Sequence, residues 1–396
     1  MEYFLYYQYV VTVLLAIILI NFIINNILYK STSRFILPPG LLKNGPLISV
    51  LIPARNEEKN IGRCLRSLRK QDYRRIEILV LDDDSSDGTG RIVEEFSEKD
   101  PRIRLIRGRS LERGWKGKSH ACHQLAREAK GEYYVFTDAD TLHFPNSISS
   151  SLEALISGKL DALSVFPKQI MVSVHERMVV IFINLAVMAL MPVGLIRKMK
   201  SPRISIANGQ FILFKRSVYK SIGGHRSIKN DIVEDVAISK QVKKYGYRFM
   251  IFDGRSTVYC RMYDGLKGVI RGFSKFIFAS MNYSVIKLGA VVSFILLLFL
   301  VPLLLLPLGL YVFNWSGLVN VMILSQVSII LVIRIAMTFR FKSRFTDIFL
   351  HPLAMFYIAV LSVNSVYQAK YGRGIFWKDR IYNIVEKDSI NSQESE

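Results

Sequence analysis

Hydrophobic residues are concentrated in long uninterrupted blocks near the two ends of the chain. The first block, 9–29, has no charged residue and reaches the ~20 residues that a helix needs to cross a bilayer. Three further blocks follow, at 288–313, 318–338 and 348–366. A cleaved signal peptide would need a basic segment and a small-residue cleavage site, which the first block lacks. We predict an N-terminal transmembrane helix within 1–30, about three C-terminal ones within 285–368, and a polar tail at 369–396.

Between residues 45 and 282 the pattern changes to short β-rich runs that alternate with stretches of helical spacing. Such alternation predicts an α/β domain with a mainly parallel sheet and covering helices. The expected strands are 47–52, ended by Pro53, then 76–81, 103–106, 132–137 and 206–214. The expected helices are 56–71, 89–98, a segment to Lys130 capped by Gly131, 217–224, and 231–246.

Pairs of acidic residues follow two of these strands. Asp82 and Asp83 come after 76–81, and Asp138 and Asp140 come after 132–137. The carboxyl ends of parallel strands form the edge where open α/β sheets bind ligands. Two carboxylates there can hold a hard cation, Mg²⁺ or Mn²⁺, whose shell is completed by substrate phosphates. A solvated polar turn would explain one pair alone, but two pairs at one edge predict a site for nucleotide chemistry.

Charge and cysteine content narrow the class of protein. The net charge of +21 is typical of nucleic-acid-binding proteins, but the basic residues flank apolar blocks, which favours contact with lipid headgroups instead of nucleic acid. Lys30, Arg34 and Lys43 follow the first block, which predicts a cytoplasmic domain after it in a multi-pass protein of the cell membrane. If every apolar block spans the membrane, the basic tail would lie outside the cell, which conflicts with the positive-inside rule. The three cysteines, Cys64, Cys122 and Cys260, indicate neither disulfides nor zinc.

Five short motifs, in order, resemble those of family 2 glycosyltransferases with the GT-A fold. They are 50–57 (VLIPARNE), 80–89 (VLDDDSSDGT), 137–140 (TDAD), Gly223-Gly224 and Glu234-Asp235, within roughly 47–275. Each motif alone is weak, and Glu234 and Asp235 alone would be explained as the acidic start of a helix. Together their order and spacing predict a Rossmann-like GT-A domain.

The resemblance implies a role for each matching residue. Pro53, Arg55 and Glu57 would border the nucleotide, and Asp82 or Asp83 would contact the uracil of a UDP-sugar. Asp138 and Asp140 would serve the ribose, the diphosphate and the metal. Asp235, next to Glu234, would be the catalytic base. Lys116 and Lys118, among glycines at a helix start, would bind the diphosphate, although a basic turn near the membrane explains them equally well.

The apolar blocks narrow the resemblance to members that modify lipids. The arrangement is similar to carotenoid glucosyltransferases of the diaponeurosporenoate and hydroxychlorobactene type, and more distantly to ceramide glucosyltransferases. Polymer-forming relatives carry Q-x-x-R-W after the catalytic acid, and this chain departs from it with 268–273 (GVIRGF), where Arg271 would still serve the diphosphate. We therefore expect transfer of a hexose, most simply glucose, from a UDP-sugar to a membrane lipid. A processive polysaccharide synthase and a non-catalytic sugar-nucleotide-binding protein are the alternatives.

A fifth apolar block, 178–196, lies between the two groups of acids. If it crossed the membrane once, Asp138 and Asp235 would stand on opposite sides and could not share a substrate. The basic residues Arg197, Lys198 and Lys200 follow it. We predict an interfacial helix at 178–200 that guides a lipid acceptor, with a buried core helix as the alternative.

Overall fold

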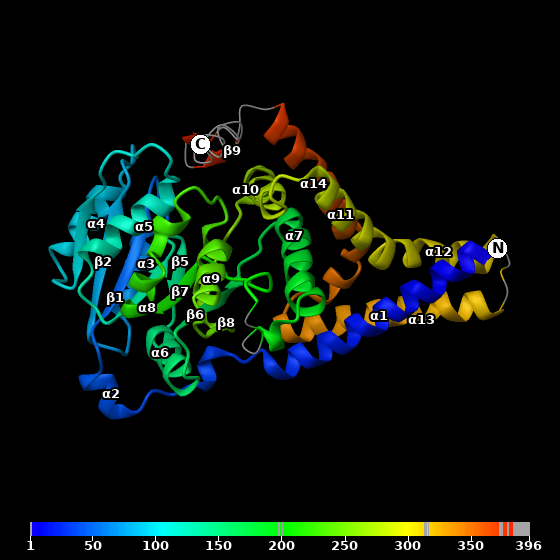
Figure 1. Cartoon of the computed structure of the whole chain (residues 1–396), viewed down its shortest axis with the longest axis horizontal. Coiled ribbons are helices and arrows are strands. Elements are labelled where there is room, and N and C mark those ends of the chain that lie inside the picture. The colour runs from blue at the N-terminus through cyan, green and yellow to red at the C-terminus, as the bar shows by residue number, and fades with distance from the viewer. Residues whose placement is uncertain are drawn as a thin grey trace. The chain divides into compact units, whose positions relative to one another are not determined.

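The computed structural model divides the chain into two compact units (Figure 1). It describes residues 2–196, 199, 201–312, 315, 317–371, 375–377 and 380–382. The sheet unit comprises Leu28–Ile170 and Val193–Met262, and the helical unit comprises Met1–Ile27, Met171–Pro192 and Tyr263–Glu396. The α/β pattern and the apolar blocks thus fold into largely separate parts of the molecule.

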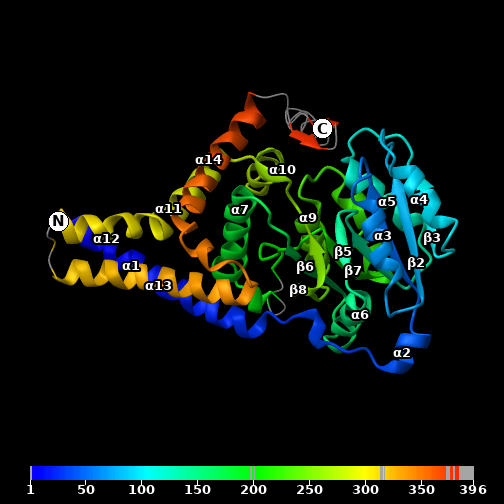
Figure 2. The ribbon, with the colours of Figure 1, turned by 180° about the vertical axis from the view of Figure 1, so that it is seen from behind.

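The sheet unit is built on one mixed sheet with the order β3-β2-β1-β4-β7-β6-β8-β5. Its strands are β1 (Ile48–Ala54), β2 (Ile76–Asp82), β3 (Ile103–Arg107), β4 (Tyr133–Thr137), β5 (Thr141–His143), β6 (Ala162–Gln169), β7 (Phe211–Lys215) and β8 (Phe249–Cys260). From β3 to β4 all pairs are parallel, and β7 runs antiparallel to β4 and β6. Figure 2 shows β2 and β3 toward one edge of this sheet. The carboxyl ends of β2, β1 and β4 therefore meet at one edge, as the acidic pairs predicted.

Helices cover both faces of the sheet and explain why its first strands are continuously apolar. Those of eight or more residues are α3 (Ile61–Arg69), α4 (Thr89–Ser97), α5 (Gly117–Glu128), α6 (Ser147–Ser157) and α9 (Glu234–Lys244). The shorter ones are α2 (Pro39–Asn44), α8 (Arg216–Ser221) and the 3₁₀ turns η1 (Thr32–Arg34), η3 (Val193–Leu195) and η4 (Gly224–Ile228). Val50, Leu51 and Ile52 of β1 are all fully buried, although they alternate between the two faces.

Several predicted boundaries were wrong, for local reasons. Pro53 lies within β1; β4 pairs only as far as Leu51, so the missing N–H of Pro53 costs no bond to β4. The helix expected from 56 begins at Ile61, because Asn56 has a left-handed φ of 51°. Gly131 does not cap α5, which ends at Glu128. Instead a Cβ at Gly131 would lie 2.6 Å from the amide nitrogen of Ser49, so glycine permits close approach to β1.

The later elements are also shorter than predicted. The strand expected from 206 begins at Phe211, and 206–210 forms a loop before β7. The helix expected at 217–224 ends at Ser221, and the one expected from 231 begins at Glu234. In each case the segment predicted from the sequence pattern was longer than the segment with regular backbone hydrogen bonds. The pattern alone does not determine where those bonds begin or end.

The helical unit contains four helices long and apolar enough to cross a membrane, among the described residues. They are α1 (Glu2–Leu28), the continuous segment Val285–Tyr311 formed by α11 (Val285–Phe299) and α12 (Val301–Tyr311), α13 (Gly317–Phe341) and α14 (His351–Lys370). The prediction of one N-terminal and three C-terminal helices is confirmed. This unit also contains α7 (Val174–Leu185), the π-turn η2 (Ala186–Leu190), α10 (Gly265–Ser280), η5 (Phe345–Ile348) and the hairpin β9 (Ile375–Trp377) and β10 (Arg380–Tyr382).

Polar side chains join the apolar helices to one another. Gln326 of α13 donates to Gln8 Oε1 and Thr12 Oγ1 of α1, both at 2.9 Å. Asn364 of α14 donates to Ser274 of α10 at 2.9 Å. Such bonds between helices satisfy polar groups that lipid cannot. The candidate spans therefore hold specific partners within their unit.

The fifth apolar block forms α7 and η2. Helix α7 packs against α10 and α14, and so belongs to the helical unit. It has 12 residues, which is too short for a span. Its interfacial placement stays a prediction, and 197, 198 and 200 lie outside the described residues, as does most of the tail.

Candidate active site

The acids after β4 stand in a tight turn between two strands. β4 ends at Thr137 and β5 begins at Thr141. Thr141 Oγ1 donates to the carbonyl of Asp138 at 2.7 Å, and Thr137 Oγ1 donates to the carbonyl of Gln210 at 2.7 Å. These bonds fix the turn from both sides. Asp138 and Asp140 are therefore held at the sheet edge by buried hydroxyl groups.

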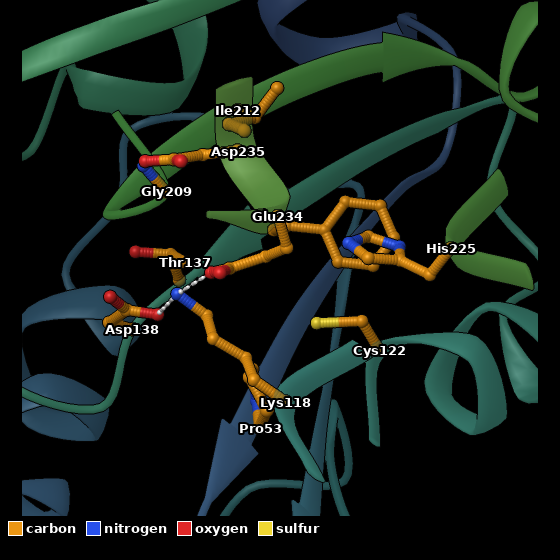
Figure 3. Close-up of a pocket in the computed structure, with 11 residues that line it drawn as sticks. Pro53, Lys118, Cys122, Thr137, Asp138, Gly209, Ile212, His225, Glu234 and Asp235 are labelled. Atoms are coloured by element: carbon orange, nitrogen blue, oxygen red, sulfur yellow. Dashed lines mark hydrogen bonds and ion pairs between the residues drawn. The ribbon is translucent and has the colours of Figure 1, made fainter. Parts of the chain in front are cut away.

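Lys118 connects the Asp138 turn to the start of α9. Its Nζ lies 2.8 Å from Asp138 Oδ1 and 2.8 Å from Glu234 Oε1 (Figure 3). The three side chains are 21%, 27% and 15% exposed. Burial would lower the pKa of Lys118, but the two carboxylates outweigh it and hold the pKa well above the ordinary value. The lysine therefore stays positively charged and bridges two acids that are 96 residues apart in sequence.

Asp235 is oriented by backbone amides. Its Oδ2 accepts from the N–H of Gly209 at 2.9 Å, and its Oδ1 accepts from the N–H of Val236 at 2.7 Å. Gly209 lies in the loop before β7, so this contact ties α9 to the sheet edge. A Cβ at Gly209 would lie 3.0 Å from Lys118 Nζ and 3.4 Å from Glu234 Oε1. The glycine therefore allows the loop to approach both charged groups.

Burial raises the pKa of two carboxyl groups of the site to near neutral pH. Desolvation, followed by the charge of Glu234, raises the pKa of Asp235 to about 7. Desolvation, followed by the charges of Asp138 and Glu57, raises the pKa of Asp140 to about 7. A carboxyl group with such a pKa can take up or release a proton at physiological pH. Asp235 has the property required of a general base.

The turn also fits a divalent cation. Asp140 Oδ1 is buried and accepts no hydrogen bond from the described residues. An unpaired buried carboxylate oxygen is costly unless a cation meets it. No group of three or more His, Cys, Asp or Glu side chains in the described part of the chain is arranged to hold a metal. Asp138 and Asp140 would accordingly supply few ligands, which is usual where substrate phosphates complete the shell.

The residues expected at the nucleotide lie on the loops after β1 and β2. Arg55 donates to the carbonyl of Asp84 at 2.9 Å and also bonds the carbonyl of Asp83, which joins the two loops. The N–H of Glu57 donates to Thr89 Oγ1 at 2.8 Å. Pro53 borders the same pocket as Lys118 and Asp235. The loops after β1 and β2 thus form one connected surface.

Asp82 and Asp83 differ in their surroundings. Both oxygens of Asp82 are engaged, Oδ2 by Arg107 at 2.8 Å and Oδ1 by the N–H of Ser85 at 3.0 Å. The N–H of Asp83 donates to the carbonyl of Ala54 at 2.8 Å, which places Asp83 directly beyond β1. The expected contact of Asp82 or Asp83 with a base stays a prediction.

Two other predicted nucleotide-binding residues lie outside this cluster of contacts. Lys116 is the N-cap residue of α5, and its N–H donates to the carbonyl of Lys229 at 2.8 Å. Arg271 lies on α10, in the helical unit. Its predicted contact with the diphosphate stays a prediction.

The pocket also includes residues that the sequence did not indicate. They are Cys122, Phe136, Gly209, Ile212 and His225, whereas Thr137 belongs to the predicted motif 137–140. The only available signal was the polar interruption Asn208-Gly209-Gln210 before an apolar strand. His225 Nδ1 lies 2.8 Å from Tyr219 Oη, and burial lowers the pKa of His225 to about 3. His225 is therefore neutral and forms part of the pocket wall.

Comparison with known proteins supports the interpretation of these motifs. Residues 49–223 match the family model described as glycosyl transferase family 2. The chain is 29% identical over 231 residues to 4,4'-diaponeurosporenoate glycosyltransferase of Staphylococcus haemolyticus, which covers 58% of this chain and 60% of that protein. The protein of the same name from Staphylococcus aureus (strain USA300) is 28% identical over 236 residues, covering 59% and 61%. The chain spans about three fifths of the length of these curated relatives.

A solved structure of a glycosyltransferase has a similar fold. The structure of a mannosyltransferase from Pyrobaculum calidifontis, in complex with GDP-Man and Mn²⁺, has a TM-score of 0.51 at 19% identity. The likeness covers 90% of this chain and 99% of that one. The family match extends from β1 to the start of η4 and so includes the Asp138 turn and the Gly209 loop. Residues 49–223 of the chain are thus similar to glycosyl transferase family 2, and the chain has the GT-A fold.

Proposed function

We propose that this protein is an inverting, metal-dependent glycosyltransferase that moves a hexose from a UDP-sugar to a membrane lipid of the carotenoid type. The observation that carries the proposal is the placement of Asp235, a carboxyl group with a pKa of about 7, in one pocket with Asp138. Glucose is the simplest donor sugar. The cell membrane is the proposed site of action, with the sheet unit on the cytoplasmic side; Lys30, Arg34 and Lys43 after the first helix support this orientation by the positive-inside rule.

Each acid would have a separate task. Asp235 takes the proton from the acceptor hydroxyl. At the same time the oxygen of that hydroxyl bonds to the anomeric carbon of the sugar, and the bond from this carbon to the diphosphate oxygen breaks. The Gly209 and Val236 amides orient the carboxylate for this transfer. Asp138 and Asp140 would hold Mg²⁺ or Mn²⁺, which neutralises charge on the departing diphosphate. Arg55, Glu57 and Asp83 would border the nucleotide.

The lipid acceptor is supported by the relatives and by the apolar helices. The curated relatives are named for a carotenoid acid, diaponeurosporenoate. Four helices of this chain are candidate membrane spans, so an apolar acceptor would reach the enzyme through the bilayer. A hydroxyl acceptor requires the base, whereas a carboxylate acceptor needs little from it. The acceptor group therefore determines how much work Asp235 performs.

The direct test uses membranes that contain the full chain. Radiolabelled UDP-glucose, UDP-galactose and UDP-N-acetylglucosamine are supplied with Mn²⁺ or Mg²⁺, and the organic extract is analysed by mass spectrometry. We expect labelled lipid with at least one donor. Asp72→Asn is a matched control, because Asp72 is exposed on the loop between α3 and β2. A water-soluble labelled polymer would indicate a polysaccharide synthase, and no labelled product with any donor would reject transferase activity.

The rate should fall on the acid side of pH 7. Asp235 must be ionised to accept a proton, and its pKa is raised to about 7 by burial first and then by the charge of Glu234. With a hydroxyl acceptor, kcat/KM should therefore decrease about tenfold per pH unit below pH 7 and level off above it. Glu234→Gln removes a neighbouring negative charge and should move this limb to lower pH. A profile that stays flat from pH 5.5 to 8 would contradict the role of Asp235 as a base.

Gly209→Ala should slow transfer without unfolding the protein. The new methyl group would lie 3.0 Å from Lys118 Nζ and 3.4 Å from Asp235 Cβ, so both groups must shift by a few tenths of an ångström. Misplaced catalytic groups lose rate strongly, and we expect kcat to fall about tenfold. Gly40→Ala is the matched control, because nothing lies within 4 Å of a Cβ there. Equal kcat values for the two variants would show that the approach of the Gly209 loop is not important.

A further inference from the structure

Lys118 contacts one of the two carboxylates that would hold a metal ion. Its Nζ contacts Asp138 Oδ1 at 2.8 Å, which is one of the oxygens available to a divalent cation at this turn. The same ammonium contacts Glu234 at 2.8 Å, and Figure 3 shows it between the two acids. The pocket around them has a volume of about 10 Å³, room for roughly one water molecule. In this state Asp138 and Glu234 are both paired with Lys118, and the pocket beside them is small.

The charges explain why Lys118 and a divalent cation exclude each other. Repulsion between an ammonium and a divalent cation is twice that between two single charges at the same distance. Asp138 would have to serve both cations with its two oxygens. Without a nucleotide, the ion pairs of the lysine are those with Asp138 and Glu234 among the described residues. Metal binding to the nucleotide-free protein must therefore break the partly buried contact between Lys118 and Asp138, which costs free energy.

A diphosphate would remove this obstacle. Lys118 is the second residue of α5, a helix of 12 residues whose first amide groups point toward its N-terminal side. An anion is stabilised there by the amides and the helix dipole. The four-carbon side chain can turn from the acids toward such an anion by rotation about its own bonds, with no backbone movement. The donor would then give Lys118 a new partner and leave Asp138 free for the metal.

We infer that Lys118 is the resident cation of the nucleotide-free site, and that a divalent cation binds Asp138 only when Lys118 leaves it for the donor diphosphate. This inference rests on the proposed use of a nucleotide-sugar. It predicts that donor and metal bind cooperatively, each raising the affinity for the other by the same factor. Lys118 is here a positioning residue whose movement opens the metal site.

The test measures Mn²⁺ binding directly, by the electron paramagnetic resonance signal of free Mn²⁺. The full chain in nanodiscs is titrated at pH 8 without nucleotide and again with saturating UDP. In the wild type we expect UDP to lower the Kd for Mn²⁺ at least tenfold. In Lys118→Met we expect the nucleotide-free Kd to be at least tenfold lower than in the wild type. UDP should lower it by a smaller factor than in the wild type, because the diphosphate still supplies metal ligands but no longer displaces the lysine. Lys118→Arg keeps the cation and should keep weak Mn²⁺ binding without UDP.

Lys220→Met is the matched control, because Lys220 is exposed on α8, and it should behave as the wild type. The inference is overturned if Lys118→Met binds Mn²⁺ no more tightly than the wild type without UDP. If that variant does not fold, a wild-type Kd that UDP leaves unchanged overturns it equally. Either result can occur in a protein that still labels lipid, whereas the proposed function fails if no donor yields labelled lipid.

Discussion

Asp235→Asn should reduce transfer to a hydroxyl acceptor by about 10²- to 10⁴-fold, which is the usual contribution of a general base. The substitution keeps the size of the side chain but removes its ability to take a proton. In the wild type both oxygens accept backbone N–H groups, from Gly209 and Val236. Asparagine retains one of these two bonds, so the start of α9 should keep its place. The measurement is kcat for labelled lipid under saturating donor.

Binding must be separated from chemistry in this experiment. The Kd for UDP in the Asp235→Asn variant should remain within about threefold of the wild type, because the substitution leaves the loops after β1 and β2 unchanged. Asp72→Asn, an identical change on an exposed loop, should leave both quantities unchanged. Near wild-type kcat with a hydroxyl acceptor would exclude Asp235 as the base. A loss of less than tenfold with a carboxylate acceptor would instead identify an acceptor that is already ionised.

The sequence predicted the location of this site because the relevant signals are local. A buried strand next to other parallel strands is apolar along its whole length, so the first acid after it marks the sheet edge. This reasoning placed Asp83 and Asp138 at one edge of the sheet, and the order β2-β1-β4 confirms the shared edge, with β1 between their two strands. The long apolar helices were equally clear, since length and hydropathy alone identify them.

The missing details depend on contacts between distant segments. β5, β6 and β8 were not predicted, because their pairing partners lie up to 119 residues away and the patterns of β6 and β8 are interrupted by charged residues. The bridge from Lys118 to both Asp138 and Glu234 has no sequence signature, since a lysine near glycines at a helix start is usually a solvated turn. The role of Gly209 appears only when the loop before β7 is placed against α9.

Asp140→Asn should abolish metal-dependent transfer while leaving the metal-free fold intact or more stable. Asp140 Oδ1 is buried and accepts no hydrogen bond from the described residues, so its charge is a cost to the folded protein unless a cation is present. Removing that charge removes the cost. The same change deprives a divalent cation of a carboxylate ligand, and losing several kcal/mol of metal stabilisation would lower kcat about 100-fold or more.

Asp138→Asn provides the contrast that separates a metal ligand from a structural acid. Asp138 is paired with Lys118, so its substitution leaves the lysine with Glu234 alone and should destabilise the fold by about 1 kcal/mol. Both variants should lose lipid labelling. In the presence of a chelator, the unfolding temperature of Asp140→Asn should be at or above that of the wild type, and that of Asp138→Asn should be below it.

Added Mn²⁺ should raise the unfolding temperature of the wild type with UDP and should not raise that of Asp140→Asn. A variant Asp140→Asn that unfolds earlier than the wild type in chelator would show that Asp140 supports the fold, and a variant that Mn²⁺ still stabilises would remove Asp140 from the metal site.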